Sequence, residues 1–586
     1  MKFKFLYISC LCAGMLLGSC NDMYDFGKDG TLTLEDVFTD YKLTGKFLNK
    51  AYSYMPYYGA SSAGGTFLAC YTDEAQDGQA VVNSAAAGYY DGKASSSDNI
   101  INNSLYDQLC QGIYICNVFL ANIDYATNMT VEAHRSKWKG EALLLRAYYY
   151  LQLIKRFGPV HIVKEPQPLD YDFSKNKVRP TFYENAKEII ADCEAALLEP
   201  ELPMRVNSIP EKGSMSKSMA YAIMSQVMLY AASPLWCGDN NYWDEALLYT
   251  ERAMNELKKA GFDLYDPTNV GVPGCTIYQD YFLLAPEYVQ QPKQDVETIY
   301  AQKGQIGDLW QNCGLPITPG ATRAGVCPTQ ELVDAYETID GKFVLNIDKP
   351  YLDDEHLMPN YNTEVLVEHG GLYDPENPYA NRDPRLKSSV YYNGSIYDLK
   401  NNKDIVYTNV GGNCGIDERN TSYTRTGYYL RKWIHYDSRK NSNKDGYWRF
   451  FRMAEIYLNY IEANFYANNK TVTSDALEIM NKIRKRAGMP PVPSDVSSKE
   501  FEYRIKNERR VELAFEEHRY YDVRRWKIQK DVEGVVTGMK ISGNNYERVL
   551  IQKRNVVDDK YLMWPIPLTE QIKYNLAGVY FQNPGW

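Results

Sequence analysis

The chain has 586 residues, of which 64 are basic and 74 acidic, so its formal net charge is −10. An acidic chain has no general attraction for phosphate backbones, and this argues against a nucleic-acid-binding protein. Hydrophobic residues make up 45% of the sequence, a share typical of globular proteins, and the length allows a large core with more than one sub-region.

The first 19 residues have the pattern of a secretory signal peptide. Lys2 and Lys4 precede a mostly apolar run over 5–17, which is too short for a spanning helix of about 20 residues. The run ends in Leu-Gly-Ser-Cys, and two small residues before a cysteine resemble a bacterial lipoprotein cleavage box. We therefore expect Cys20 to be lipidated and to anchor the protein to a membrane. The alternative is an ordinary cleavage site with a chance cysteine.

Helical periodicity dominates the first part of the mature chain. The uncharged stretch 219–236 is interrupted by Ser225, Gln226 and Pro234, so it predicts a buried helix rather than a second membrane segment. The stretch 242–260 repeats apolar residues at the i, i+3, i+4 spacing of one buried face. The helices expected in this part lie near 34–54, 104–125, 131–156, 181–198, 215–232 and 242–260.

Three more helices are expected near 450–468, 473–487 and 500–525. Several helices form couples with short connections: 104–125 with 131–156, 181–198 with 215–232, and 473–487 with 500–525. Paired helices of this kind are typical of tetratricopeptide-like repeats, although the strict period of about 34 residues is missing. The sequence thus predicts a mostly α fold, a tetratricopeptide-like helical-repeat scaffold whose stacked helix pairs leave a concave surface.

Two irregular segments interrupt the helices. The first, 57–103, is rich in Ser, Ala, Gly and Tyr, and the second, 262–446, is rich in turn residues and holds short β-like runs. Long ordered loops on a scaffold often bind ligands. We therefore divide the mature chain into a scaffold of 20–261 and 447–586 and a loop-rich, ligand-binding insertion of 262–446.

The sequence carries no catalytic or metal-binding motif. The six histidines do not pair at HxH or HExxH spacing, and GxSxG, GxGxxG and Walker patterns are absent. Nine cysteines remain after Cys20, without a CxxC pair, which favours neither a zinc site nor a disulfide framework. With 74 acidic residues a glycosidase pair is possible, but nothing marks one. We expect no enzyme activity, no metal and no cofactor.

Tyrosine is the one compositional excess, with 51 residues against 19 phenylalanines. A tyrosine ring offers a flat apolar face and a hydroxyl at low conformational cost, which suits the stacking of sugars. Tyrosines within helices are more often packing residues, so the informative ones lie in the irregular segments. For each of these, packing in the core remains an equal alternative to ligand contact.

The stretch ERRVELAFEEHRYYDVRRW (508–526) concentrates charge. Read as one helix, it places Arg509 three residues before Glu512, Glu516 before Arg519 and Asp522 before Arg525, which is ion-pair spacing. An apolar stripe that ends at His518 then faces inward, so this histidine is expected in the core. The spacing predicts a structural role.

The same stretch resembles the hallmark helix of the SusD/RagB family of surface nutrient-binding lipoproteins. The resemblance covers most of the chain. Its further motifs are WKGEALLLRAYYYLQLIKRFGPV (138–160), PTQELVDAYETIDGK (328–342), NRDPRL (381–386), TGYYLRKW (426–433), RMAEIYLNYIEA (452–463), NKIRKRAG (481–488) and the ending from Trp564 to Trp586.

The resemblance implies four tetratricopeptide-like units and an irregular ligand-binding half. It also implies a partner, a SusC-type TonB-dependent β-barrel of the outer membrane, to which the lipid-anchored protein delivers a nutrient without catalysis. The nutrient is usually a glycan, although relatives with peptide cargo exist. A protein-binding helical scaffold and an anchored glycoside hydrolase are the rival hypotheses. The hallmark charges belong to the scaffold, whereas the ligand-binding residues implied are Asp73, Tyr89, Tyr90, Tyr281, Tyr288 and Trp310.

Overall fold

The computed structural model describes most of the mature chain. The described residues are 32–56, 66–78, 85–97, 103–126, 129–168, 170–206, 213–271, 274–283, 295–303, 309–399, 403–417, 419–435, 446–556 and 558–586.

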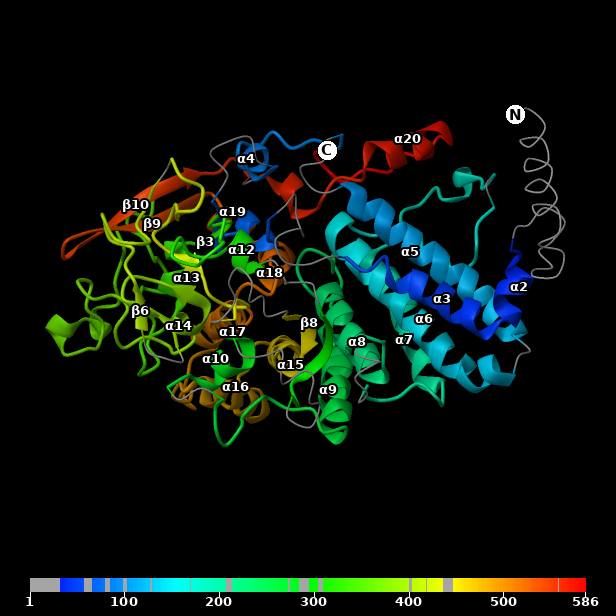
Figure 1. Ribbon diagram of the computed structural model, residues 1–586, viewed down its shortest axis with the longest axis horizontal. Coiled ribbons are helices and arrows are strands. Elements are labelled where there is room, and N and C mark those ends of the chain that lie inside the picture. Colours follow the sequence, from blue (N-terminus) through cyan, green and yellow to red (C-terminus); the bar gives the residue numbers. More distant parts are fainter. Residues whose placement is uncertain are drawn as a thin grey trace, which may run out of the picture.

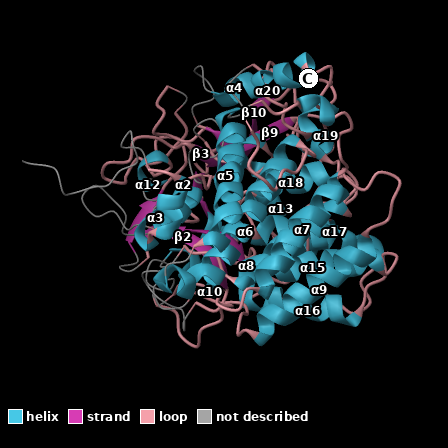
Figure 2. Cartoon of the chain, turned by 90° about the vertical axis from the view of Figure 1, so that its right-hand side faces the viewer, coloured by secondary structure: helices cyan, strands magenta, loops and turns pink. Residues whose placement is uncertain are grey.

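The N-terminal half is a layer of long helices at the right of Figure 1. Each helix packs against the next along the chain, α5 on α6, α6 on α7, α7 on α8 and α8 on α9. Figure 2 shows how the helices cover this side of the molecule. Their bounds are α2 Leu34–Thr39, α3 Tyr41–Tyr52, α5 Asn103–Asn122, α6 Met129–Phe157, α7 Phe182–Leu198, α8 Lys217–Ala231 and α9 Trp243–Lys259.

Side-chain caps fix where several of these helices begin. The Thr181 hydroxyl accepts from the backbone N–H of Glu184 and the Glu184 carboxylate accepts in return, which is a capping box at the start of α7. The Asp40 carboxylate accepts from the Leu43 N–H at the start of α3. The six predicted early helices are confirmed, except that Asp40 divides the first into α2 and α3.

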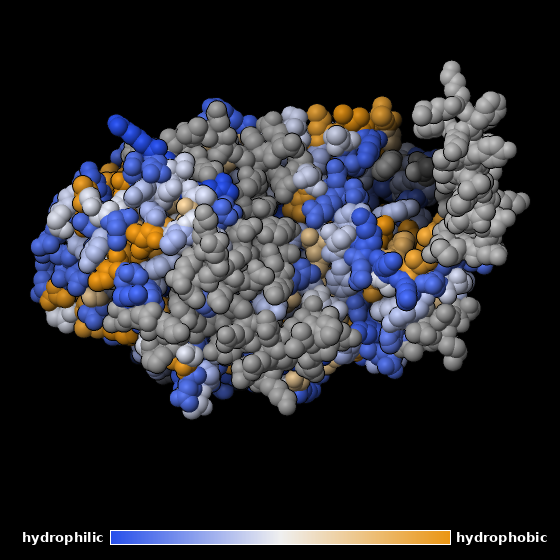
Figure 3. Space-filling model, viewed as in Figure 1, coloured by the Kyte–Doolittle hydropathy of each residue, from blue (hydrophilic) through white to orange (hydrophobic). Residues whose placement is uncertain are grey.

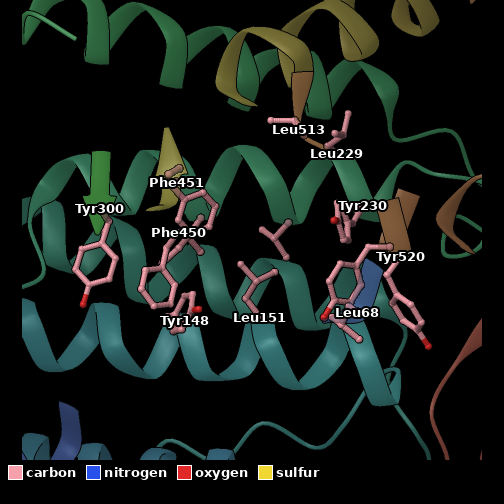
Figure 4. Close-up of a cluster of buried hydrophobic side chains, with 14 of the residues drawn as sticks. Leu68, Tyr148, Leu151, Leu229, Tyr230, Tyr300, Phe450, Phe451, Leu513 and Tyr520 are labelled. Carbon is pink, nitrogen blue, oxygen red and sulfur yellow. The ribbon is translucent and has the colours of Figure 1, made fainter. Parts of the chain in front are cut away.

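Helix α8 is buried on nearly every side because α7, α9 and α15 (Met453–Ala467) pack around it. Its neighbour α9 buries one face, including Ala246, Thr250 and Met254. Figure 4 shows the core beside α8, where Tyr148 and Leu151 of α6 lie near Phe450 of strand β8 (Tyr447–Arg452) and Tyr230 of α8. The uncharged stretch is therefore a core helix, as predicted, and no helix of the described residues is long and apolar enough to cross a membrane.

The late helices are α15, α16 (Ser474–Ala487), α17 (Ser498–Glu512) and α18 (His518–Arg525). The first two match the prediction, and α16 ends at Gly488, whose φ of 80° is the left-handed conformation that favours glycine. Helices α16 and α17 both pack on α15. Helices α16 and α17, which were predicted to pair with each other, are joined by buried ion pairs such as Arg484 Nη1 to Glu508 Oε2 at 3.2 Å.

The predicted single helix 500–525 is wrong, because the chain breaks between α17 and α18. Phe515 and Glu517 have φ angles of 59° and 66°, which are unfavourable for residues with a side chain. Side chains from distant segments satisfy the carbonyls of the break. Lys432 Nζ donates to the Ala514 carbonyl at 2.8 Å, and the Trp433 indole N–H donates to the Phe515 carbonyl at 2.9 Å.

The loop-rich part at the left of Figure 1 contains short helices and antiparallel strand pairs. Strand β2 (Thr298–Lys303) pairs with β8 (Tyr447–Arg452), β1 (Ala75–Asp77) with β3 (Val326–Pro328), and β9 (Val535–Ser542) with β10 (Asn545–Lys553). The remaining strands are β4 Val390–Tyr391, β5 Ser395–Asp398, β6 Lys403–Val406 and β7 Tyr429–Leu430. The short helices are η1 Leu68–Tyr71, α4 Ala85–Tyr90, η3 Ile123–Tyr125, η4 Phe173–Lys175, α10 Ile277–Leu283, α12 Leu309–Asn312, α13 Gln330–Ala335, η5 Thr363–Val365, η6 Val367–His369, α14 Leu386–Ser389, α19 Gln529–Val532, η7 Asp559–Leu562 and α20 Leu568–Leu576.

The main core cluster joins the two parts of the chain. It includes Tyr148 and Met453 from the scaffold ranges and Tyr278, Tyr336 and Trp433 from 262–446. The mostly helical fold is confirmed, whereas the boundaries of the ligand-binding insertion stay a prediction.

Helix α20 lies on the surface near the C-terminus. Leu568, Ile572 and Leu576, four residues apart, are exposed, and Figure 3 shows an apolar patch where Figure 1 places α20. Tyr574 is the buried residue of this helix, and its ring stacks on Phe581 with centroids 4.6 Å apart. The Leu568 N–H, at the start of the helix, also donates to the Ser96 carbonyl at 3.1 Å.

Candidate functional site

The tyrosines predicted from the first irregular segment lie in the core. Tyr89 is 2% exposed, and its hydroxyl accepts from Arg524 Nη2 at 2.8 Å. Tyr90 is 1% exposed and donates its hydroxyl to the Cys70 carbonyl at 2.5 Å. The guanidinium of Arg554 lies 4.2 Å from the centre of the Tyr90 ring. Both rings are therefore surrounded by other side chains of the core, with Tyr71 and Tyr561 meeting Tyr89 edge to face.

The aromatic candidates from the second segment are also covered. The Tyr281 ring is buried between Tyr265, at 5.2 Å, and the guanidinium of Arg449, at 4.1 Å. Trp310 on α12 is 9% exposed, and its indole N–H has no hydrogen-bond partner among the described residues. Tyr288 and the lipidation candidate Cys20 lie outside the described residues.

Asp73 lies at the end of the turn after η1, and two arginines hold it. Arg519 donates Nε and Nη2 to the two carboxylate oxygens at 2.8 and 2.9 Å, and Arg510 Nη2 lies 2.7 Å from Oδ2. Burial alone would raise the pKa of this carboxyl, but the two guanidinium groups outweigh burial and lower it to about 2. Asp73 is therefore ionised and fixes the loop 66–78 to α17 and α18.

A cavity of about 290 Å³ opens beside Asp73, and Asp73 is the one predicted site residue among those that line it. This volume is close to the lower end for small-molecule sites, about 300 Å³. The lining residues come from α13, α17, α18, α19 and the loop 343–356. They are Asp73, Glu331, Asp334, Ala335, Phe343, Leu345, Pro350, Tyr351, His356, Tyr503, Lys506, Asn507, Arg510, Arg519, Ile528, Asp531 and Val532.

Two aromatic pairs form the apolar walls of this cavity. Tyr351 and His356 stack with centroids 4.0 Å apart and planes 15° from parallel. Phe343 and Tyr503 meet edge to face at 4.8 Å. Tyr351, His356 and Tyr503 are only partly buried, so they present ring surface to the cavity, unlike Tyr89 and Tyr90.

Helix α17 supplies one wall by its periodicity. Tyr503, Lys506, Asn507 and Arg510 follow the i, i+3, i+4, i+7 spacing, so they share one face, and all four line the cavity. This spacing is visible in the sequence, but Arg510 lies within the stretch 508–526, whose charge spacing predicts a structural role. The facing residues 343–356 gave no such signal, because their irregular backbone has no period.

Most charges of the hallmark stretch form buried ion pairs, but these pairs are mostly different from the predicted ones. Asp522 pairs with Arg525 at 2.8 Å as the spacing predicted. Arg509 pairs with Asp522 instead of Glu512, and Arg519 pairs with Asp73 instead of Glu516. The break at 515–517 separates Glu516 from Arg519, whereas Arg509 and Glu512 both lie in α17 and pair with other segments.

Glu512 lies at the centre of a buried charge cluster. It accepts from Arg452 Nη1 at 2.8 Å and from Arg385 Nη1 at 3.0 Å, and Arg486 also pairs with it. Glu516 accepts from Arg452 Nε at 2.7 Å. These long-range pairs join segments that are far apart in the sequence.

The described histidines and cysteines do not form a metal-binding cluster. His518 is buried as predicted, and burial lowers its pKa to about 3, so it is neutral. The nine cysteines after Cys20 are all free thiols. Within the described part of the chain, no group of three or more His, Cys, Asp or Glu side chains is arranged to hold a metal ion.

Comparisons with known proteins agree with the fold. The model of the SusD family matches residues 288–586, and a model described as starch-binding associating with outer membrane matches residues 37–229. No functionally curated protein matches the sequence.

Three of the solved structures with this fold are 20–23% identical to the chain. A SusD-like protein from Bacteroides fragilis NCTC 9343 is 23% identical with a TM-score of 0.74, over 94% of this chain and 99% of its own. A SusD-like carbohydrate binding protein from the same organism is 22% identical with a TM-score of 0.68, over 92% and 98%. Surface glycan-binding protein A from Bacteroides fluxus is 20% identical with a TM-score of 0.54, over 94% and 100%. Since the SusD family model alone spans more than half of the sequence, the chain belongs to the SusD family.

Proposed function

We propose that this protein is a non-catalytic surface lipoprotein that captures an oligo- or polysaccharide and delivers it to a SusC-type TonB-dependent transporter of the outer membrane. Membership of the SusD family supports this role, and two proteins with the same fold are named as carbohydrate-binding or glycan-binding. The description of the second family model, starch-binding associating with outer membrane, points the same way.

The cavity beside Asp73 is the observation that carries the proposal. A sugar ring has apolar C–H faces and a rim of hydroxyls, so its site needs aromatic surface next to hydrogen-bonding groups. The rings of Tyr351 and Tyr503 supply that surface, while Asn507 and Arg510 supply polar groups on the same wall as Tyr503. This combination is typical of small-molecule sites.

The binding test is native affinity electrophoresis of residues 21–586 through gels that contain single polysaccharides. We expect one glycan to retard the protein, and Tyr351→Ala and Tyr503→Ala to abolish the retardation. The matched control is Tyr125→Ala, since this ring is 76% exposed and lies outside the cavity. Retardation that both cavity variants retain would place the glycan elsewhere, and retardation by no glycan would favour peptide cargo or a protein-binding scaffold.

The anchor and the partner need a separate test. Cys20→Ala is expected to leave the fold intact and to release the protein from outer membranes that lack the transporter. In cells with the transporter, affinity purification of the barrel should recover the wild-type lipoprotein. Continued membrane fractionation of the variant without the barrel would disprove the lipid anchor, and an empty pull-down would argue against the partnership.

A further inference from the structure

The charges around Asp73 do not balance. Arg510 and Arg519 are both held by this single carboxylate. The neighbouring Glu74 is buried, and burial raises its pKa to about 8, so it is mostly neutral at pH 7. One positive charge therefore remains at this end of the cavity.

Two further carboxylates in the cavity wall are held by hydrogen bonds, one with an arginine and one without. Arg548 Nη1 and Nη2 each lie 2.7 Å from an oxygen of Asp334 and neutralise it. Glu331 accepts from the backbone and hydroxyl of Thr537 and lies 3.2 Å from His356 Nδ1.

The two charges at the rim differ in their pairing. Lys506 pairs with Glu502 at 3.1 Å, whereas Asp531 is exposed and therefore well screened. Neither group cancels the charge beside Asp73 through a described contact.

Arg510 still has hydrogen-bonding capacity. Its Nη2 is used by Asp73, and its Nε is buried without a partner among the described residues, so a ligand cannot reach either of them freely. The arginine side chain is 14% exposed, and its Nη1 is neither paired with a described residue nor among the buried atoms, so a ligand can reach this donor from the cavity. An anionic acceptor would make a strong, charge-assisted hydrogen bond with Nη1.

We propose that the cavity binds an acidic sugar, whose carboxylate accepts from Arg510 while the ring lies against Tyr351 and Tyr503. The inference rests on the proposed glycan-binding function and adds the class of sugar. The carboxylate supplies the negative charge that Asp73 alone does not provide for two arginines. Asp531 at the rim is too exposed to repel it strongly.

The test is isothermal titration of residues 21–586 with two panels of oligosaccharides. The acidic panel comes from polygalacturonate, alginate and hyaluronan, and the neutral panel from starch, laminarin, xylan and methyl-esterified galacturonan. The esterified galacturonan matches polygalacturonate except for its charge. We expect binding of at least one acidic ligand, with loss of about 10- to 100-fold in affinity in Arg510→Gln, as for a lost hydrogen bond to a charged group.

Two controls separate charge from folding. Arg419→Gln removes the same charge from an exposed site outside the cavity and is expected to bind as the wild type does. Arg510→Lys keeps the charge with a different donor geometry and should retain part of the affinity. Thermal unfolding of each variant shows whether the fold is kept.

The possible outcomes distinguish this inference from the function on which it rests. Acidic binding that Arg510→Gln weakens and Arg419→Gln does not would support it. Binding of neutral glycans alone, or acidic binding unaffected by Arg510→Gln, would overturn the acidic-sugar inference and leave glycan capture standing. Failure to bind either panel would overturn the inference together with the glycan reading of the cavity.

Discussion

Substitution of Asp73 by asparagine tests whether its ion pairs hold the loop 66–78 against α17 and α18. The carboxyl is 2% exposed, and its pKa is lowered from 3.8 to about 2 because Arg510 and Arg519 outweigh the effect of burial. A shift of this size corresponds to about 2 kcal/mol of stability at neutral pH. Asparagine keeps the size but leaves two arginines without a counter-charge, so we expect a total loss of about 3–5 kcal/mol.

The direction of the pKa shift of Asp73 determines how the stabilisation depends on pH. The folded-state pKa is below the unfolded one, so the stabilisation is complete above about pH 4 and disappears as the pH falls towards 2. Urea unfolding at pH 7, 4.5 and 3, followed by tryptophan fluorescence, measures the difference between wild type and variant. The control Asp124→Asn removes an exposed pair with Lys139 at 2.9 Å and should cost less than about 1 kcal/mol. Equal losses in both variants, or a deficit of Asp73→Asn that stays constant down to pH 3, would refute the reasoning.

Two further substitutions test the buried charges. Glu512→Gln leaves Arg385, Arg452 and Arg486 with too little negative charge. The free energy of unfolding measured in urea should therefore fall by about 3–5 kcal/mol. A loss below about 1 kcal/mol would contradict a central role for this carboxylate. Glu74 has a raised pKa of about 8, so the folded state binds its proton more tightly and stability from this group falls as pH rises from 4.5 to 8. Glu74→Gln should therefore gain stability relative to the wild type between pH 6 and 8.5 in the same assay, and parallel pH profiles would disprove the shift.

The helices could be predicted because their determinants are local. Apolar periodicity and capping residues such as Thr181 and Ser497 lie within a few residues of the turns they stabilise. The break between α17 and α18 has distant determinants. Lys432 and Arg452 donate to carbonyls of the break and to the carboxylate of Glu516. Neither residue can be predicted as a partner from the spacing of residues within 508–526.

The candidate site was harder to predict because loop position does not decide exposure. Tyr89 and Tyr90 were chosen as aromatics in an irregular segment, but α4 packs its aromatic end against η1 and buries them. A buried tyrosine needs a partner for its hydroxyl, and Arg524 and Cys70 provide those partners from elsewhere in the chain. Composition therefore located the tyrosines without separating packing from binding.

Asp73 shows how a family resemblance can mark a site without revealing the role of each residue. The resemblance implies this carboxylate as a ligand-binding residue, yet both of its oxygens are paired with Arg510 and Arg519. Arg510 keeps its Nη1 without a described partner, and it shares the face of α17 with Tyr503. Asp73 is the one carboxylate that pairs with both Arg510 and Arg519, so it positions Arg510 at the cavity. In the proposed complex with an acidic sugar, the ligand carboxylate would be the second anion beside these two arginines, and the preference for acidic ligands would follow from this pairing.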